Sequence, residues 1–242
     1  MDVDFGRTAL DYAHYRTVFP PELFTRLAGL GVGLAGQRVV DLGTGTGVLA
    51  RGFAAAGCQV TGVDIAPEML AQADDGTVTY RVAPAEDTGL PASAWDVVSA
   101  GQCWHWFDQP RAAAEARRLL VDGGALVICS RDYLVTPGSV AAVSEELVLA
   151  HNPGWPMAAG IDSPPEVPGF DRVETFEFDV TVEFTHEQWR GRMRSSNGVA
   201  ASLPAAGVAA FDADLAALLR ERFPREPIAV PHRIRGLVAR LS

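Results

Sequence analysis

The chain has 242 residues, of which 48% are hydrophobic and 21% are charged, and its formal net charge is -10 with a sequence pI near 4.9. This composition predicts one globular domain with a sizeable core, and the acidic charge disfavours nucleic acid and anionic membrane surfaces as partners. The scattered cysteines Cys58, Cys103 and Cys129 form no C-x-x-C pair, so neither a structural zinc site nor a disulfide framework is expected.

Residues 1–19 carry aromatic and polar side chains without strand alternation, and they lack the basic and apolar regions of a signal peptide. No apolar run in the chain approaches the ~18 residues of a membrane span, so we expect a soluble, cytoplasmic protein. Pro20 and Pro21 predict the start of a helix, because proline is tolerated in the first turn. This helix is expected to end near Gly31.

From residue 37 onward, short β-branched runs alternate with helical segments. The predicted strands cover residues 37–42, 58–63, 78–82, 95–99 and 124–129. The predicted helices cover residues 46–56, 67–73 and 110–120. Strands separated by helices indicate parallel βαβ units. We therefore predict an α/β fold with a doubly wound, Rossmann-like sheet that binds ligands at the carboxyl ends of its strands.

After residue 130 this alternation stops. The sequence predicts a helix over 139–150, an ordered loop or lid in the proline-rich segment 151–169, a strand over 173–182, helices over 185–195 and 211–223, and a final strand over 228–238. No linker divides the chain, so we predict a single domain. Its parts would be an N-terminal lid and helix (1–35), a cofactor-binding core (36–135), and a substrate-shaping insertion with the C-terminal strands (136–242).

The strongest motif is V-V-D-L-G-T-G-T-G at residues 39–47, between a predicted strand and a predicted helix. Glycine permits a sharp turn and a close approach of backbone N–H groups to a ligand. A dinucleotide fingerprint, G-x-G-x-x-G, would need glycine where this chain has Val48. Asp41 precedes the turn, and its carboxylate suits an ammonium group better than a pyrophosphate. S-adenosylmethionine has that ammonium and no phosphate, so we favour it over a nicotinamide cofactor. A plain strand-to-helix turn remains the alternative.

Two further acidic residues follow predicted strands. Asp64 comes about 20 residues after Gly43, where a carboxylate can accept hydrogen bonds from both ribose hydroxyls. Alternatively, Asp64 caps the helix predicted at 67–73. After the third strand, Ala85 and Glu86 would meet adenine, whose exocyclic amine needs an acceptor; the alternative is a solvated loop carboxylate.

Several segments of the chain match one enzyme family. They are D-Y-A-H-Y-R at residues 11–16, the glycine turn, V-T-G-V-D-I-A-P-E-M-L at 60–70, A-P-A-E-D-T-G-L-P at 83–91, A-G-Q-C-W-H-W-F-D at 100–108 and E-A-R-R-L-L at 115–120. Together they resemble class I S-adenosylmethionine-dependent methyltransferases, in the small-molecule branch that includes trans-aconitate-type enzymes. The resemblance implies a seven-stranded sheet in the order 3-2-1-4-5-7-6 with the last strand antiparallel, and helices on both faces. It also implies a lid formed by the N-terminal segment and the segment after the fifth strand.

The resemblance assigns roles to individual residues. Those implied to bind S-adenosylmethionine are Asp41, Gly43 and Gly45 at its methionine end, Asp64 at its ribose, Ile65, Met69, Ala85 and Glu86 at its adenine, and Tyr15, Arg16, Thr44, Gly47, Gln102 and Trp104 around it. S-adenosylhomocysteine would be the product, and no metal is expected.

Methyl transfer from a sulfonium is an in-line displacement, which needs alignment of nucleophile, carbon and sulfur and the exclusion of water. The segment after the fourth strand should lie beside the methyl group, where aromatic faces can stabilise the sulfonium. His105 in this segment is the candidate general base, because histidine titrates near neutral pH. A carboxylate acceptor would need no base, and the alternative is a structural role for His105 beside core aromatic residues.

The candidate substrate-binding residues are Tyr12, His14, Trp106, Arg131, Trp155 and Arg194. Tyr12, Tyr15 and Arg16 would form part of the N-terminal lid, with Arg16 near the cofactor carboxylate or, alternatively, on the surface. Arg192 and Arg194 point to different faces of a predicted helix, so at most one is expected in the site.

The sequence therefore predicts methyl transfer from S-adenosylmethionine to an oxygen, nitrogen or carbon of a small molecule, such as a carboxylate or a natural-product intermediate. The alternatives are an S-adenosylmethionine-binding protein without transferase activity and a nicotinamide-dependent oxidoreductase, which Val48 and Asp41 disfavour.

Overall fold

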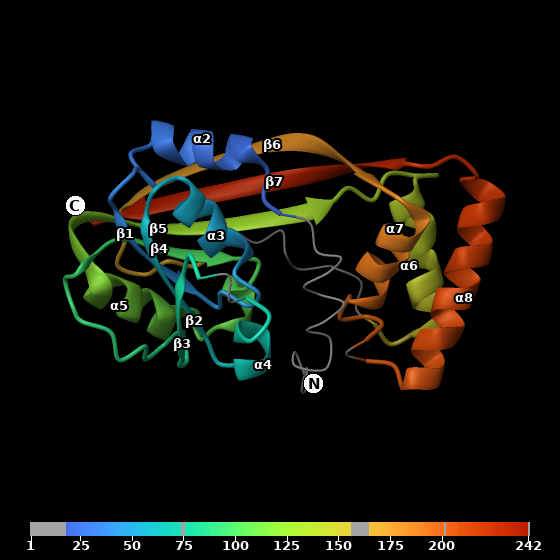
Figure 1. Cartoon of the computed structure of the whole chain (residues 1–242), viewed down its shortest axis with the longest axis horizontal. Helices are drawn as coiled ribbons and strands as arrows, with labels where there is room; N and C mark the ends of the chain where they lie inside the picture. Colours follow the sequence, from blue (N-terminus) through green and yellow to red (C-terminus); the bar gives the residue numbers. More distant parts are fainter. Residues whose placement is uncertain (1–17, 74–75, 156–164, 201, 242) are drawn as a thin grey trace. The chain divides into compact units, whose positions relative to one another are not determined.

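The structure is a computed structural model that describes residues 18–73, 76–155, 165–200 and 202–241 (Figure 1). These residues fall into two compact units. The helical unit contains the described parts of residues 132–162 and 179–233, and the sheet unit contains the described parts of residues 18–131, 163–178 and 234–242. The predicted single domain, with its three parts, stays a prediction.

Seven strands and eight helices are described within these ranges. The strands are β1 (Arg38–Leu42), β2 (Gln59–Asp64), β3 (Thr79–Val82), β4 (Trp95–Gly101), β5 (Leu120–Tyr133), β6 (Arg172–Phe184) and β7 (Ile228–Arg240). The helices are α2 (Pro21–Gly29), α3 (Val48–Ala55), α4 (Pro67–Leu70), the 3-10 helix η2 (Trp104–Trp106), α5 (Gln109–Leu119), α6 (Val140–His151), α7 (His186–Arg194) and α8 (Ala205–Arg222). Among them, none is long and apolar enough to cross a membrane.

The strands form one sheet in the order β3-β2-β1-β4-β5-β7-β6, with β7 antiparallel (Figure 1). The pairs β1–β2, β1–β4, β2–β3 and β4–β5 are parallel. Asp41 in β1 lies opposite Gly62 of β2 and Ser99 of β4. The predicted fold and strand order are confirmed, and the carboxyl ends of the central strands meet at one edge of the sheet.

Helices cover both faces of the parallel strands. Crossover connections between parallel strands are right-handed. Helices in connections that run toward opposite edges of the sheet therefore lie on opposite faces. On one face, Val40 and Leu42 of β1 share a buried cluster with Ala112 of α5. On the other, Phe53 of α3 is fully buried and its ring meets Phe24 of α2 edge-on at 5.5 Å. This packing fixes β1 between two helical layers.

The helical unit has its own core. Trp189 of α7, Phe184 at the end of β6 and Phe211 of α8 are buried in one cluster. The indole N–H of Trp189 donates to Ser144 Oγ of α6 at 2.9 Å, so this buried polar group is satisfied. Helices α6, α7 and α8 therefore pack around a shared aromatic centre.

Two elements, β5 and α8, begin several residues before their predicted starts. The prediction began the fifth strand at residue 124, but β5 begins at Leu120, which pairs with Trp95 before the register shifts and Ala125 pairs with Val97. Residues 121–124, V-D-G-G, do not show the pattern of a regular strand, so the irregular start of β5 could not be predicted from them. Helix α8 begins at Ala205 instead of 211, because packing in the helical unit outweighs the propensity cost of a helical glycine, about 1 kcal/mol.

Candidate functional site

The turn after β1 is built from glycines in left-handed conformations. Gly43, Gly45 and Gly47 have φ values of +60°, +55° and +76°, which residues with a side chain rarely adopt. A Cβ atom on Gly43 would also lie 2.8 Å from Cys103 Sγ and from Phe107 Cζ. Gly47 is the N-cap residue of α3. The predicted strand, turn and helix are confirmed, and the glycines are needed both for φ and for close packing.

Asp41 is buried directly before this turn, with 1% of its surface exposed. Its two carboxylate oxygens accept hydrogen bonds at 2.7 Å from Thr44 Oγ1 and from Ser99 Oγ. Burial raises the pKa of Asp41 from 3.8 to about 6, although both hydrogen bonds oppose the rise and the charge of Asp64 adds to it. A cation beside Asp41 would favour its ionised form.

Asp64 connects the glycine turn to the start of α4. Its Oδ2 accepts from the backbone N–H of Gly45 at 2.7 Å, and its Oδ1 accepts from the N–H of Ala66 at 2.9 Å. The N-cap residue of α4 is Ala66, so Asp64 does not cap that helix in the way considered from sequence. Its ribose role stays a prediction.

The residues predicted to border adenine differ in exposure. Ile65 is 70% exposed, whereas Met69 is buried and its Cε lies 3.3 Å from the position of a Cβ on Gly45. Ala85 is buried in the core cluster. Glu86 Oε1 accepts from the backbone N–H of Asp108 at 3.0 Å, so the loop after β3 is joined to the segment after β4.

Gln102 begins the segment after β4 with an unusual backbone conformation. Its φ is +64°, which is uncommon for a residue other than glycine and is often found at functional sites. Its backbone N–H donates to Cys129 O at 2.9 Å, and its side-chain amide donates to the carbonyl of Arg131. These bonds hold the residue after β4 against β5.

The following 3-10 helix separates its aromatic residues. Trp104 is buried in the core and donates its indole N–H to Glu166 O at 3.2 Å. His105 and Trp106 are exposed, and their ring centroids lie 4.9 Å apart. In this segment, therefore, Trp104 faces the core, whereas His105 and Trp106 face the solvent.

Arg131 lies within β5, the partner strand of β4, and belongs to the sheet unit. It is buried, one guanidinium nitrogen donates to the carbonyl of Val18, and its Cζ lies 6.0 Å from the centre of the Phe19 ring. This places a cation two residues beyond the pairing of Gly101 with Cys129.

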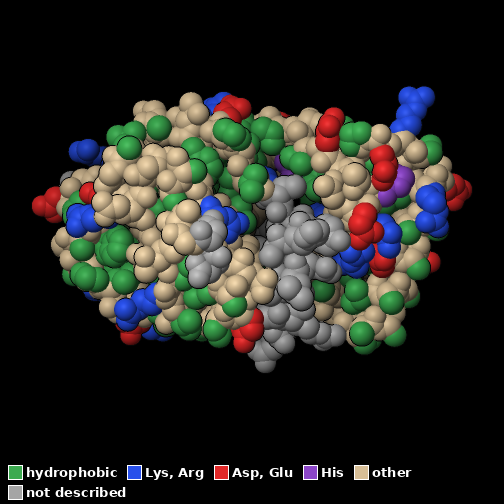
Figure 2. Space-filling model, viewed as in Figure 1, with side chains coloured by type: hydrophobic (Ala, Val, Ile, Leu, Met, Phe, Trp, Pro, Cys, Tyr) green, Lys and Arg blue, Asp and Glu red, His purple; other side chains and the backbone are tan. Residues whose placement is uncertain are grey.

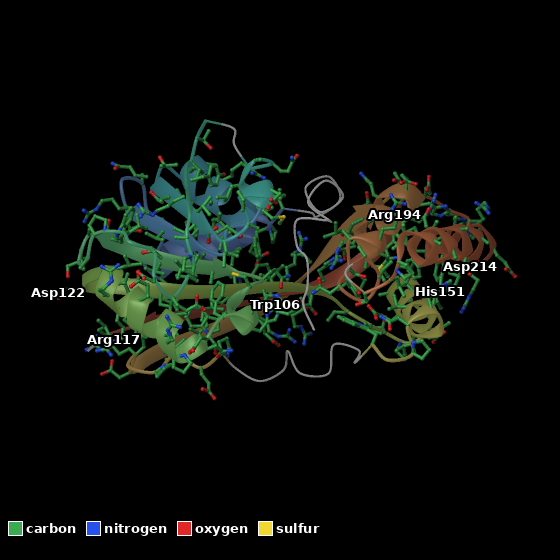
Figure 3. All side chains as sticks on the ribbon, turned by 90° about the horizontal axis from the view of Figure 1, so that it is seen from below. Trp106, Arg117, Asp122, His151, Arg194 and Asp214 are labelled. Atoms are coloured by element: carbon green, nitrogen blue, oxygen red, sulfur yellow. The ribbon has the colours of Figure 1, made fainter. Side chains whose placement is uncertain are left out.

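Arg194 belongs to an ion-pair network in the helical unit (Figure 3). Its guanidinium contacts Asp212 at 2.6 Å and Glu187 at 2.8 Å; burial lowers the pKa of Arg194, but the two carboxylates together raise it above its ordinary value. Arg192 is buried instead, with its guanidinium 5.2 Å from the centre of the Tyr133 ring. The two arginines thus make different contacts, as their spacing predicted. On the face shown in Figure 2, acidic and basic side chains lie interspersed.

Other predicted residues lie elsewhere. Trp155 is partly buried against the core of the helical unit, beside Gly198. The glycine turn belongs to the sheet unit, so the two are not in the same unit. Four predicted residues lie outside the described ones: Tyr12, His14, Tyr15 and Arg16.

Sequence reasoning missed three side chains at the turn. Ser99 donates to Asp41, and its place follows from strand register, which a local motif does not encode. Cys103 and Phe107 lie against Gly43, and burial raises the pKa of the Cys103 thiol far above its ordinary value. Their place in the segment after β4 indicated that they lie near the site, but it did not predict their contact with Gly43.

Comparison with known proteins connects this arrangement to one family. A methyltransferase domain model matches residues 40–128. An uncharacterised methyltransferase of Mycobacterium tuberculosis is 36% identical over 128 residues, 52% of this chain and 51% of that protein, so the chain spans about half the length of this relative. A ubiquinone biosynthesis O-methyltransferase of Xanthomonas oryzae is 30% identical over 173 residues, 68% of this chain and 72% of that enzyme.

One solved structure extends the similarity over most of the chain. A protein from Anaeromyxobacter dehalogenans described as a type II methyltransferase has a TM-score of 0.72 and 28% identity. The match covers 93% of this chain and 98% of that one.

Proposed function

Because this chain belongs to the class I S-adenosylmethionine-dependent methyltransferases, we propose that it transfers a methyl group from S-adenosylmethionine to an oxygen, nitrogen or carbon of a small molecule. The observation that carries this proposal is the glycine turn after β1, with the carboxylates of Asp41 and Asp64 beside it. The acceptor class, a carboxylate or a natural-product intermediate, is part of the proposal.

The polar groups around the turn fit this cofactor. Two carboxylates offer acceptors for an ammonium group and for ribose hydroxyls, and they would repel a pyrophosphate. The N–H of Gly45, which a phosphate-binding turn would direct at its ligand, donates to Asp64. These contacts support S-adenosylmethionine over a nicotinamide dinucleotide.

We assign the cofactor contacts accordingly. Asp41 would bind the ammonium group, and Asp64 the ribose. Adenine would be bordered by Ile65, Met69, Ala85 and Glu86. When bound, S-adenosylmethionine supplies an electrophilic methyl group on a sulfonium. The exposed Ile65 is available to cover an apolar ring, and burying such a side chain contributes roughly 1.5–3 kcal/mol.

The segment after β4 would serve the acceptor. His105 is exposed on the 3-10 helix η2. Trp104, the residue before it, is buried in the core, so the backbone that carries the His105 imidazole is fixed. We propose that an imidazole nitrogen of His105 takes the proton of an acceptor that must lose one. The exposed ring of Trp106 would help to exclude water from the reacting atoms.

The contacts of the arginines favour Arg131 over Arg194 for an acceptor carboxylate. Arg194 is engaged by two carboxylates of its own unit, whereas Arg131 lies in the unit that holds the glycine turn, near the end of β4. Contributions of Trp155 and the N-terminal residues, and a cytoplasmic location, stay predictions.

Isothermal titration calorimetry with S-adenosylhomocysteine and with NAD tests the cofactor assignment. We expect binding of the first and none of the second; the reverse result would overturn the proposal. Incubation with methyl-labelled S-adenosylmethionine and panels of carboxylates, phenols and amines tests transfer. Tight binding without labelled product in any panel would favour the binding-protein alternative.

A further inference from the structure

Two side chains hold the glycine turn from a direction that the proposed cofactor contacts do not use. Arg51 of α3 donates from Nη1 to the carbonyl of Thr46 within the turn. The same nitrogen donates to the carbonyl of Ala73 at 3.4 Å, and Tyr80 of β3 donates its hydroxyl to that carbonyl at 3.1 Å. The buried Ala73 carbonyl therefore joins α3, the turn after α4 and β3.

The Tyr80 side chain also explains why position 62 is a glycine, although Gly62 has no positive φ. A Cβ on Gly62 would lie 2.9 Å from the Tyr80 ring and 2.8 Å from Thr44 Cγ2. A Cβ on Gly47 would collide with the Tyr80 hydroxyl. The Tyr80 side chain thus lies across β2 and reaches the end of the glycine turn, in space that these glycines leave open.

The segment held by Ala73 carries part of the proposed cofactor site. Helix α4 has four residues, too few to be stable without tertiary contacts. Its residue Met69 lies against Gly45 of the glycine turn, and Asp64, at the end of β2 shortly before the helix, accepts from the N–H of Gly45. Because Arg51 and Tyr80 fix the residues that follow α4, they restrict the separation between this helix and the turn.

We propose that Arg51 and Tyr80 are positioning residues for the cofactor, which hold the glycine turn and α4 at the separation that binding needs. This inference rests on the proposed function. Neither side chain is in the described hydrophobic core, so its removal should loosen the site more than it destabilises the fold.

Calorimetry with S-adenosylhomocysteine on the full chain tests this inference with Tyr80→Phe, Arg51→Met and the double variant. Loss of one hydrogen bond to a carbonyl predicts about two- to tenfold weaker binding for Tyr80→Phe. The double variant should lose more than the product of the single effects, because the Ala73 carbonyl keeps one of these two donors in each single variant and loses both in the double variant. Arg51→Lys, which can still donate to one carbonyl, should recover part of the affinity. Tyr133→Phe in the helical unit is the matched control and should bind like the wild type.

Two further results distinguish the possible failures. If the wild type binds but Tyr80→Phe and Arg51→Met bind equally well, the positioning role is overturned, even if urea unfolding midpoints fall. If the wild type does not bind, the proposed function fails and the cofactor role with it. In that case, amide hydrogen exchange at residues 45–47 and 69–73, compared between the wild type and the two variants, decides whether Arg51 and Tyr80 join these segments. Faster exchange in both variants supports that junction, and unchanged exchange overturns it.

Discussion

Replacing Asp41 by asparagine should stabilise the folded chain at neutral pH and weaken its binding of the cofactor. Burial raises the pKa of Asp41 from 3.8 to about 6. This difference corresponds to about 3 kcal/mol. Because the folded-state pKa is raised, the ionised carboxylate lowers the free energy of unfolding above pH 6, and this penalty disappears as the pH falls towards 3.8. Asparagine buries no charge, so the variant should be more stable than the wild type at pH 8 by up to about 3 kcal/mol.

The same titration predicts how binding responds to pH. An ammonium group beside Asp41 needs the ionised carboxylate, and the ionised fraction falls tenfold for each pH unit below the pKa. The Kd of the wild type for S-adenosylhomocysteine should therefore be about tenfold higher at pH 5 than at pH 7. Asp41→Asn should bind more weakly at pH 7 and show no such pH dependence.

Urea denaturation and calorimetry at pH 5, 6, 7 and 8 measure both effects. Asp122→Asn is a suitable control, because Asp122 is exposed (Figure 3) and should change neither quantity. A variant at Asp41 that is less stable than the wild type at pH 8, together with wild-type binding that does not vary with pH, would refute the reasoning.

Three other substitutions have defined outcomes. Ser99→Ala removes a donor that favours the ionised form of Asp41, so calorimetry should show the loss of binding beginning at a higher pH than in the wild type. Glu115→Ala removes the acceptor for the backbone and hydroxyl of Thr88 and should lower the free energy of unfolding in urea by about 2–3 kcal/mol. The pKa of Glu115 is lowered, so this stabilisation is present at neutral pH and should diminish as the pH falls through the carboxyl's folded-state pKa. Gly43→Ala meets both a positive φ and two close side chains, so calorimetry should show at least a tenfold loss of affinity for S-adenosylhomocysteine, with a folded far-UV spectrum.

Local sequence was sufficient where neighbouring residues dictate the conformation. Alternating strands and helices predicted the parallel part of the sheet, and right-handed crossovers then placed the strand ends at one edge. The glycine turn was predictable because its residues need positive φ whatever surrounds them. Asp64 could be placed beside the turn because both lie at the carboxyl ends of adjacent strands. The family resemblance supplied the order of β7 and β6, which alternation alone did not give.

The sequence by itself thus determined the strand-to-helix turns and the acidic residues beside them, because these depend on contacts close along the chain. Only the tertiary structure decided which aromatic side chain after β4 is buried: Trp104 faces the core and Trp106 the solvent. It also decided that Arg194 is held by carboxylates from two helices, and that Ser99 lies opposite Asp41. Those outcomes depend on strand register and helix packing, which are set by the free energy of burying many distant residues together.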